Sequence, residues 1–364
     1  MTASNAGEHF SQSYQEARSK FLAAAEAAGL DVESHAHPML GRDGEPLAMD
    51  VARDGRRDAG SLLIVSSACH GVEGFCGSGV QTALLQHRPW RKAAQDAGVA
   101  VLYIHALNPY GFSWWRRTTH ENVDLNRNFH DFGQPLPRSP AYDEMASVIV
   151  PTTWPPPAEG EATLQRVALE RGLPALQEVI TGGQYEHPEG LFYGGHDPTW
   201  SRVTLRHVLQ DHASRCARLG WIDLHTGLGT RGVGERIFAC RDDAAALRRA
   251  RAWWGDEVTS LYDGSSSSAP LQGQMWLSAY DECAQAEYTG IALEFGTLPI
   301  MEVINALRAD QWLENHPDAP EAQRLQIKRQ MRDVFYIDTD AWKRQVIDQA
   351  VDAAYGAVGG LAAR

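Results

Sequence analysis

The fold is decided by the stretch Ser61-Leu-Leu-Ile-Val-Ser-Ser-Ala-Cys-His70-Gly-Val-Glu73-Gly74. Its apolar, β-branched run is short and uninterrupted, which is typical of a buried strand. The run ends abruptly in a histidine and a glutamate three positions apart, with small residues around them. Glycine allows a close approach of the backbone to a neighbouring group. The stretch therefore predicts a strand that delivers His70 and Glu73 to the edge of a sheet.

Two later runs end in the same way. Trp221-Ile-Asp-Leu-His225-Thr-Gly227 ends in a histidine, and Thr289-Gly-Ile-Ala-Leu-Glu294-Phe-Gly296 ends in a glutamate. Predicted strands alternate with predicted helices almost throughout the chain, which indicates an α/β fold. In open α/β sheets, ligands bind beyond the carboxyl ends of the strands. We therefore expect these strand ends to converge on one site.

The 364 residues are interpreted as a single domain, 1–364, with three added regions. Residues 1–60 predict a helix, over 11–29, followed by a hairpin, and residues 300–364 predict C-terminal helices. Between them, 133–200 is interpreted as an insertion that forms a lid over the site. Its proline-rich part, 133–160, need not form regular structure, whereas 161–180 predicts one helix.

Composition excludes several classes of protein. The formal net charge of −13 argues against a nucleic-acid partner. Five cysteines without a C-x-x-C pair predict neither a disulfide framework nor a cysteine zinc site. No apolar run approaches the roughly 18 residues of a membrane span, and Met1–Phe10 lacks the apolar core of a signal peptide. A cytoplasmic protein without a membrane partner is the expectation, and the oligomeric state stays open.

The pair His70 and Glu73 suits a metal if the chain turns sharply between them. Histidine nitrogen and carboxylate oxygen are zinc ligands, and a catalytic zinc typically has three protein ligands and a water. By itself the pair is better explained as a buried histidine and a capping glutamate. The histidine and glutamate at the other two strand ends, each flanked by glycine, favour the metal interpretation.

Six motifs in order then resemble the pattern of the zinc carboxypeptidase family, over about residues 62 to 297. They are His70-Gly-Val-Glu73, Asn108-Pro-Tyr-Gly111, Trp115-Arg116-Arg117, Asp124-Leu-Asn126-Arg127-Asn128, Asp223-Leu-His225 and Leu293-Glu294. The motifs H-G-V-E-G and E-F-G-T are most similar to a little-characterised bacterial branch, which is related to the aspartoacylase and succinylglutamate desuccinylase group. The resemblance implies a mixed, largely parallel twisted sheet with helices on both faces.

The resemblance also implies a metal site. His70, Glu73 and His225 would hold one Zn²⁺ per chain. Glu294 would be the general base that takes a proton from the attacking water and passes it to the leaving nitrogen. Asp124 would hydrogen-bond the ligand His70, although it could equally be a turn residue.

Further residues would bind the substrate. By the same resemblance, Arg116 would stabilise the oxyanion, and Asn126 and Arg127 would hold a substrate carboxylate. Tyr193 in the insertion is added as a substrate contact. The neighbouring Arg117 is interpreted as equally suited to a structural role.

Three functions follow from these assignments. The first is a zinc-dependent hydrolase that cleaves a peptide-like amide bond next to a free carboxylate, with a small peptide as its substrate. The second is a deacylase of N-acyl amino acids, of the aspartoacylase type. The third is a non-catalytic metal-binding or ligand-binding protein. The family's tyrosine cannot be placed, because Tyr280 and Tyr288 are the nearest before Glu294 and neither has the family's spacing.

Overall fold

Seven strands form one mixed sheet in the computed structural model, which describes residues 6–363. The strands are β1 (Val32–Leu40), β2 (Pro46–Asp54), β3 (Ser61–Ser67), β4 (Val99–His105), β5 (Arg218–Gly227), β6 (Gly234–Phe238) and β7 (Glu287–Gly296). Their order across the sheet is β1-β2-β4-β3-β5-β7-β6. The four central strands, β4, β3, β5 and β7, run parallel, and the outer strands are antiparallel to their neighbours. The predicted mixed α/β sheet is confirmed.

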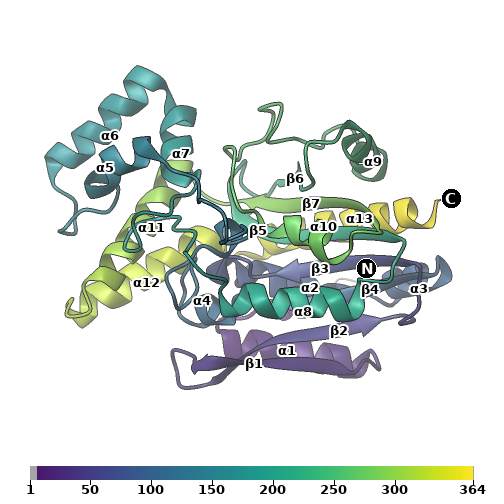
Figure 1. Ribbon diagram of the computed structural model, residues 1–364. Helices are drawn as coiled ribbons and strands as arrows, with labels where there is room; N and C mark the ends of the chain where they lie inside the picture. Colours follow the sequence, from purple (N-terminus) through teal and green to yellow (C-terminus); the bar gives the residue numbers. More distant parts are fainter. Residues whose placement is uncertain (1–5, 364) are drawn as a thin grey trace.

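Helices cover both faces of this sheet (Figure 1). On the near face lie α8 (Trp200–His212) and α10 (Ser278–Glu282). On the far face lie α1 (Tyr14–Ala27), α2 (Gly74–Gln86) and α13 (Asp340–Ala362), with α3 (Arg88–Asp96) at the side. Because both faces are covered, β3 and β4 are buried along their whole length. This burial explains why their sequences are continuous apolar runs rather than alternating ones.

The remaining helices gather beyond the carboxyl ends of the central strands. The 133–200 segment contains α5 (Pro140–Ile149), α6 (Ala158–Arg171) and α7 (Leu173–Thr181), and these lie next to α11 (Ile300–Asn315) and α12 (Glu321–Phe335) in Figure 1. The buried Arg308 of α11 joins the two groups, since it donates to the carbonyl of Ile149 at 2.8 Å and pairs with Glu161 at 2.8 Å. Two short helices complete the fold, α4 (Pro109–Ser113) and α9 (Ala244–Trp254).

The structure adds one helix to this segment and divides another. Residues 133–160 contain α5, where Pro140 occupies the first turn, because its fixed φ and missing N–H favour helix initiation. The single helix expected over 161–180 is two helices. Gly172, with a φ of 87°, separates them, and Pro174 stands in the first turn of the second.

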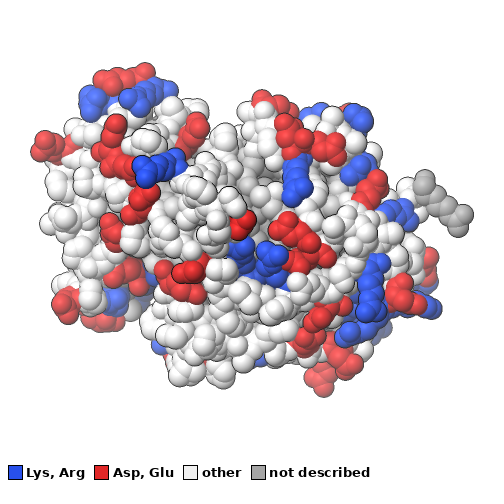
Figure 2. Space-filling view, viewed as in Figure 1, with Lys and Arg blue, Asp and Glu red and all other residues white. Residues whose placement is uncertain are grey.

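The visible surface is largely uncharged and carries scattered groups of acidic and basic side chains (Figure 2). Among residues 6–363, no helix is both long enough and apolar enough to cross a membrane.

Candidate metal and active site

A tight turn follows β3 and carries the two polar residues of the opening stretch. The 3₁₀ turn Gly71–Glu73 is held by two backbone hydrogen bonds, from Gly71 N to the Arg117 carbonyl at 3.1 Å and from Val72 N to the Arg116 carbonyl at 2.7 Å. A Cβ on Gly71 would stand 2.1 Å from the carbonyl carbon of Gly111. Only glycine allows this contact, and the resulting turn directs His70 and Glu73 to the same point.

His225, at the end of β5, meets these two residues. Its Nδ1 lies 3.0 Å from Glu73 Oε2 and 3.3 Å from His70 Nδ1, and His70 Nδ1 lies 2.8 Å from Glu73 Oε1. Two imidazole nitrogens bound tetrahedrally at zinc–nitrogen distances of roughly 2.0–2.1 Å would lie about 3.3 Å apart. The observed nitrogen separation fits a shared zinc ion, and the three side chains form a candidate three-ligand site.

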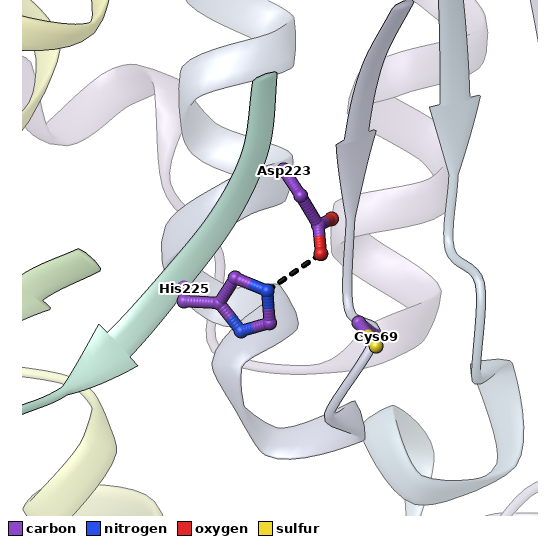
Figure 3. Close-up of side chains that lie close together, drawn as sticks. All are labelled: Cys69, Asp223 and His225. Carbon is purple, nitrogen blue, oxygen red and sulfur yellow. Dashed lines mark hydrogen bonds and ion pairs between the residues drawn. The ribbon is translucent and has the colours of Figure 1, made fainter. Parts of the chain in front are cut away.

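The opposite nitrogen of each imidazole faces a buried carboxylate. His225 Nε2 lies 2.5 Å from Asp223 Oδ2, and both side chains project from β5 towards one another (Figure 3). Ser66 holds the other Asp223 oxygen at 2.5 Å. Asp124 stands 3.4 Å from His70 Nε2, as the resemblance implies, and its Oδ1 also accepts from Asn126 N in a turn. A carboxylate partner of this kind fixes the orientation of a ligand histidine and leaves the Nδ1 of His225 to face the metal. The Nε2 of His70 is shared between Asp124 and Arg117, whose Nη2 lies 2.7 Å away.

Cys69 also lies near Asp223 and His225, at the end of β3 (Figure 3). It is fully buried, and burial raises the pKa of its thiol well above the ordinary value. The thiol therefore stays protonated and behaves as a core residue.

Glu294 lies beside the three ligands because β7 pairs with β5 in a register that sets Glu294 opposite His225. Its Oε1 accepts a hydrogen bond from Leu228 N at 2.9 Å. Burial and then the negative charge of Glu73 raise the pKa of Glu294 to about 8. Burial acts in the same direction on Glu73, but the positive charges of His70 and His225 hold its pKa well below the ordinary value. One carboxylate is thus suited to metal binding and the other to proton transfer.

Asn126 and Arg127 line the same cavity from the short 3₁₀ turn Leu125–Arg127. Arg127 donates to two carbonyls, of Asn126 at 2.9 Å and Thr181 at 2.6 Å, and its buried Nε has no partner. Within residues 6–363 no carboxylate pairs with it. The Asn126 Oδ1 accepts from Met275 N at 2.9 Å, so the amide NH₂ is the end left available. Both side chains offer donors to an anion.

The structure separates the two adjacent arginines. Arg116 points away from the cavity, where its Nε donates to Asp310 at 3.3 Å and its Nη2 to Asn122 at 2.8 Å. Arg117 lines the cavity instead, with its Nε on Asp124 at 2.8 Å and its Nη2 2.7 Å from His70 Nε2. The chain bends at these residues, and the two side chains leave it in different directions. The site contains Arg117, not the predicted Arg116.

Tyr193 is also placed differently from the expectation. Its backbone carbonyl accepts from Asp124 N at 2.8 Å, while its ring packs beside His196, outside the cavity. The preceding residue, Phe192, lines the cavity, and the guanidinium carbon of Arg117 lies 4.8 Å from its ring centroid. No tyrosine among residues 6–363 lines the cavity. Tyr280 and Tyr288 are hydrogen-bonded to backbone elsewhere.

Most of the remaining lining is apolar, with Thr181, Thr226 and Ser268 as its polar members, and none of the apolar residues was predicted from the sequence. One group comes from outside the C-terminal helices and consists of Ile237, Leu261, Leu271, Trp276 and Ala292. The other group comes mainly from α11 and α12. The helical spacing over 300–307 was a usable signal, but it did not indicate which face of the helix would meet the strand ends.

Comparisons with known proteins support this fold. A search of curated proteins finds no match. Among solved structures, the chain is similar to thrombin-activatable fibrinolysis inhibitor, with a TM-score of 0.54, 13% identity and coverage of 99% of this chain and 78% of the other. It is also similar to a metallo-carboxypeptidase from Burkholderia cenocepacia, with a TM-score of 0.45, 10% identity and coverage of 96% and 70%. The first likeness shows a shared fold.

The shared fold agrees with the mixed, largely parallel sheet that the sequence predicted. A family model also matches residues 10–349, which is nearly the whole chain, and its description is "Protein of unknown function (DUF2817)". The chain belongs to this DUF2817 family.

Proposed function

We propose that this protein is a zinc-dependent hydrolase that cleaves an amide bond next to a free carboxylate. The observation that carries the proposal is the convergence of three kinds of group in one cavity. These are the candidate ligands His70, Glu73 and His225, a separate buried carboxylate at Glu294, and the guanidinium of Arg127, whose buried Nε has no hydrogen-bond partner among residues 6–363. A binding module needs no second carboxylate beside its metal, which disfavours the non-catalytic alternative.

Each group has a role in the reaction. When bound, zinc polarises the scissile carbonyl and lowers the pKa of its water to about 7. Glu294 accepts the proton of the attacking water and delivers it to the leaving nitrogen, a task for which its position beside the three candidate ligands is suited. Arg127 and the Asn126 amide hold the substrate carboxylate, since a planar guanidinium can bind both carboxylate oxygens.

The oxyanion role expected for Arg116 is reassigned to Arg117. Its guanidinium lines the cavity beside His70, and Asp124 holds it in place through Nε at 2.8 Å. A fixed charge in a site from which water is excluded stabilises developing negative charge more strongly than a mobile one. The 133–200 insertion acts as a lid in this proposal, because Thr181 and Phe192 contribute to the wall of the cavity.

The carboxylate requirement can be tested with paired substrates. The zinc-loaded enzyme should hydrolyse N-acyl-leucine or a short leucine peptide and should lose most activity, on the order of a hundredfold in kcat/KM, on the matching C-terminal amides. Arg127→Met should lose the same preference, whereas Arg138→Met, on the surface outside the cavity, should keep it. Equal rates on free and amidated substrates would refute the role of Arg127.

A further inference from the structure

An apolar wall lines the cavity next to Glu294. We define it as six residues: Leu228, Ile300, Val303, Ile304, Leu307 and Phe335. Four of them come from α11 at spacings of three and four, which places them on one face of that helix. None of the six has a side chain that can form a hydrogen bond. This wall can therefore contact hydrocarbon but cannot recognise a polar group.

The wall begins directly at the proposed base. Leu228 N donates to Glu294 Oε1 at 2.9 Å, and Thr226 Oγ1 donates to the Phe335 carbonyl at 2.7 Å, which attaches α12 to the end of β5. The groups proposed to hold the carboxylate are anchored elsewhere, on Thr181 and Met275. A substrate with its carboxylate on Arg127 and its amide at Glu294 would extend its acyl part along the wall.

Charge restricts that acyl part further. Besides Glu73 and Glu294, no acidic residue among positions 6–363 lines the cavity, so the α-ammonium of a peptide would have no partner of its own. The basic residues of the lining are Arg117 and Arg127. Arg117 already pairs with Asp124, and Arg127 holds the carboxylate of the amino acid. An additional carboxylate on the acyl group would therefore also be unpaired. Burying an unpaired charge is costly.

We infer that the substrate is an N-acyl amino acid with an uncharged hydrocarbon acyl group bound along the apolar wall. This inference rests on the proposed hydrolase function and selects the deacylase over the peptidase. It also excludes acidic acyl groups such as succinyl. Burial of each methylene group on the wall should raise kcat/KM about fourfold until the chain fills the space.

A substrate series tests this directly on the zinc-loaded enzyme. The series consists of N-acetyl-, N-butanoyl-, N-hexanoyl-, N-octanoyl- and N-succinyl-leucine and the dipeptide leucyl-leucine. We expect kcat/KM to rise along the four saturated acyl groups and to be lowest for the succinyl compound and the dipeptide. Independence of chain length, or a preference for either charged substrate, would overturn the inference and leave the hydrolase intact. If no member is hydrolysed, the proposed function fails and the inference fails with it.

Binding provides a second test that does not depend on turnover. Calorimetric titration of the zinc-loaded Glu294→Gln variant with the same series should give a Kd that falls as the acyl chain lengthens. A Kd that is the same for the acetyl and octanoyl compounds would contradict the apolar wall, even if the wild-type enzyme hydrolyses both.

A charge introduced into the apolar wall tests whether the wall, rather than another part of the α11 region, binds the acyl chain. Ile300 is half-buried at the start of the helix, where an acidic residue is compatible with the helix dipole. Ile300→Asp should lower the octanoyl-to-acetyl ratio of kcat/KM at least about tenfold. Pro299→Asp places the same charge one residue earlier, on an exposed position outside the cavity, and should keep the ratio. An unchanged ratio in a folded Ile300→Asp protein, checked by thermal melting, would refute the wall.

Discussion

Two carboxylates of the same cavity, Glu73 and Glu294, have opposite electrostatic surroundings. Glu73 lies within 3.0 Å of two histidine nitrogens and accepts from Thr226 N, whereas Glu294 has one backbone donor and faces the charge of Glu73. Hydrogen bonds to the charged form lower the pKa of an acid, and burial beside a like charge raises it. At the scale of single residues, this difference separates a candidate ligand from a candidate base.

Replacing Glu294 by glutamine removes the base while keeping its shape. Glu294→Gln should bind zinc like the wild type but hydrolyse N-acyl-leucine about 10²- to 10⁴-fold more slowly, which is the usual contribution of a general base. Metal content by atomic absorption and kcat by product release measure the two effects separately. Glu287→Gln, an exposed position on the same strand, is the matched control. Wild-type turnover by Glu294→Gln would rule out this mechanism.

The raised pKa of Glu294 also predicts a pH dependence of stability in the metal-free protein. Because the folded-state pKa of about 8 exceeds the ordinary 4.5, the folded state holds the proton more tightly than the unfolded state does. The stability contributed by this proton is fully present below about pH 4.5 and is lost as the pH rises towards 8. Between pH 5 and 8 the free energy of unfolding of the wild type should therefore fall relative to Glu294→Gln, by on the order of a few kcal/mol.

Urea denaturation of both metal-free proteins at several pH values measures this difference. The lowered pKa values of Glu73 and Asp124 act in the opposite sense, because their contribution is lost as the pH falls. That loss occurs below about pH 4.5, outside the range of the comparison, so between pH 5 and 8 the difference between the two proteins reports Glu294. Parallel stability curves for the two proteins over this pH range would show that Glu294 is ionised normally.

At the scale of elements, the 3₁₀ turn Gly71–Glu73 decides whether a ligand pair forms after β3. The turn packs against α4 so closely that the backbone of Gly111 occupies the space of a side chain at Gly71. A strand alone would project His70 and Glu73 to opposite faces of the sheet. The turn brings them together, which makes its glycine an essential part of the candidate metal site.

An alanine at Gly71 should therefore disturb both stability and metal binding. The new Cβ meets backbone atoms that cannot move independently, and such overpacking costs about 1–3 kcal/mol or more. Gly71→Ala should lower the melting temperature and weaken zinc affinity. Gly60→Ala, just before β3 and with no atom within 4 Å of its new Cβ, should leave both nearly unchanged. Calorimetry and zinc titration with a chromophoric chelator measure the two effects, and wild-type zinc affinity in Gly71→Ala would refute the role of the turn.

At the scale of the whole molecule, the site joins parts of the chain that are far apart in sequence. The candidate ligands come from the turn after β3 and from β5, the base comes from β7, and α12 is attached to β5 beside them. A bound ion would connect β3 to β5 across 155 residues, since His225 and His70 are 225 − 70 positions apart. Metal binding should consequently stabilise the fold and not only the site.

Removal of the metal should lower the melting temperature of the whole domain. A ligand at a hundred times its Kd stabilises the folded state by about 2.7 kcal/mol. Treatment with a chelator should lower the melting temperature by several degrees, and Zn²⁺ should restore it. Mg²⁺ should not, because it prefers oxygen ligands in octahedral geometry. Scanning calorimetry of the two re-loaded samples measures this, and equal rescue by Mg²⁺ would argue against a nitrogen-ligated zinc site.

Local patterns in the sequence were sufficient to predict the fold and the polar residues at the strand ends. Continuous apolar runs identified β3, β5 and β7, because parallel strands covered on both faces must be apolar throughout. The polar residues that terminate these runs identified His70, His225 and Glu294. Their convergence follows from the parallel direction of the strands, which the alternation with helices already indicated.

The tertiary structure alone decided what surrounds these residues. Arg116 and Arg117 are adjacent and chemically identical, so the choice of Arg117 depends on partners as distant as Asp310 and Asp124. The apolar wall comes from a helix that follows the last strand, and periodicity does not show which face of a helix meets a neighbouring element. The sequence by itself thus determined the fold and the chemical groups at the strand ends, which depend on local pattern. The structure determined the lining of the cavity, which depends on packing between distant segments.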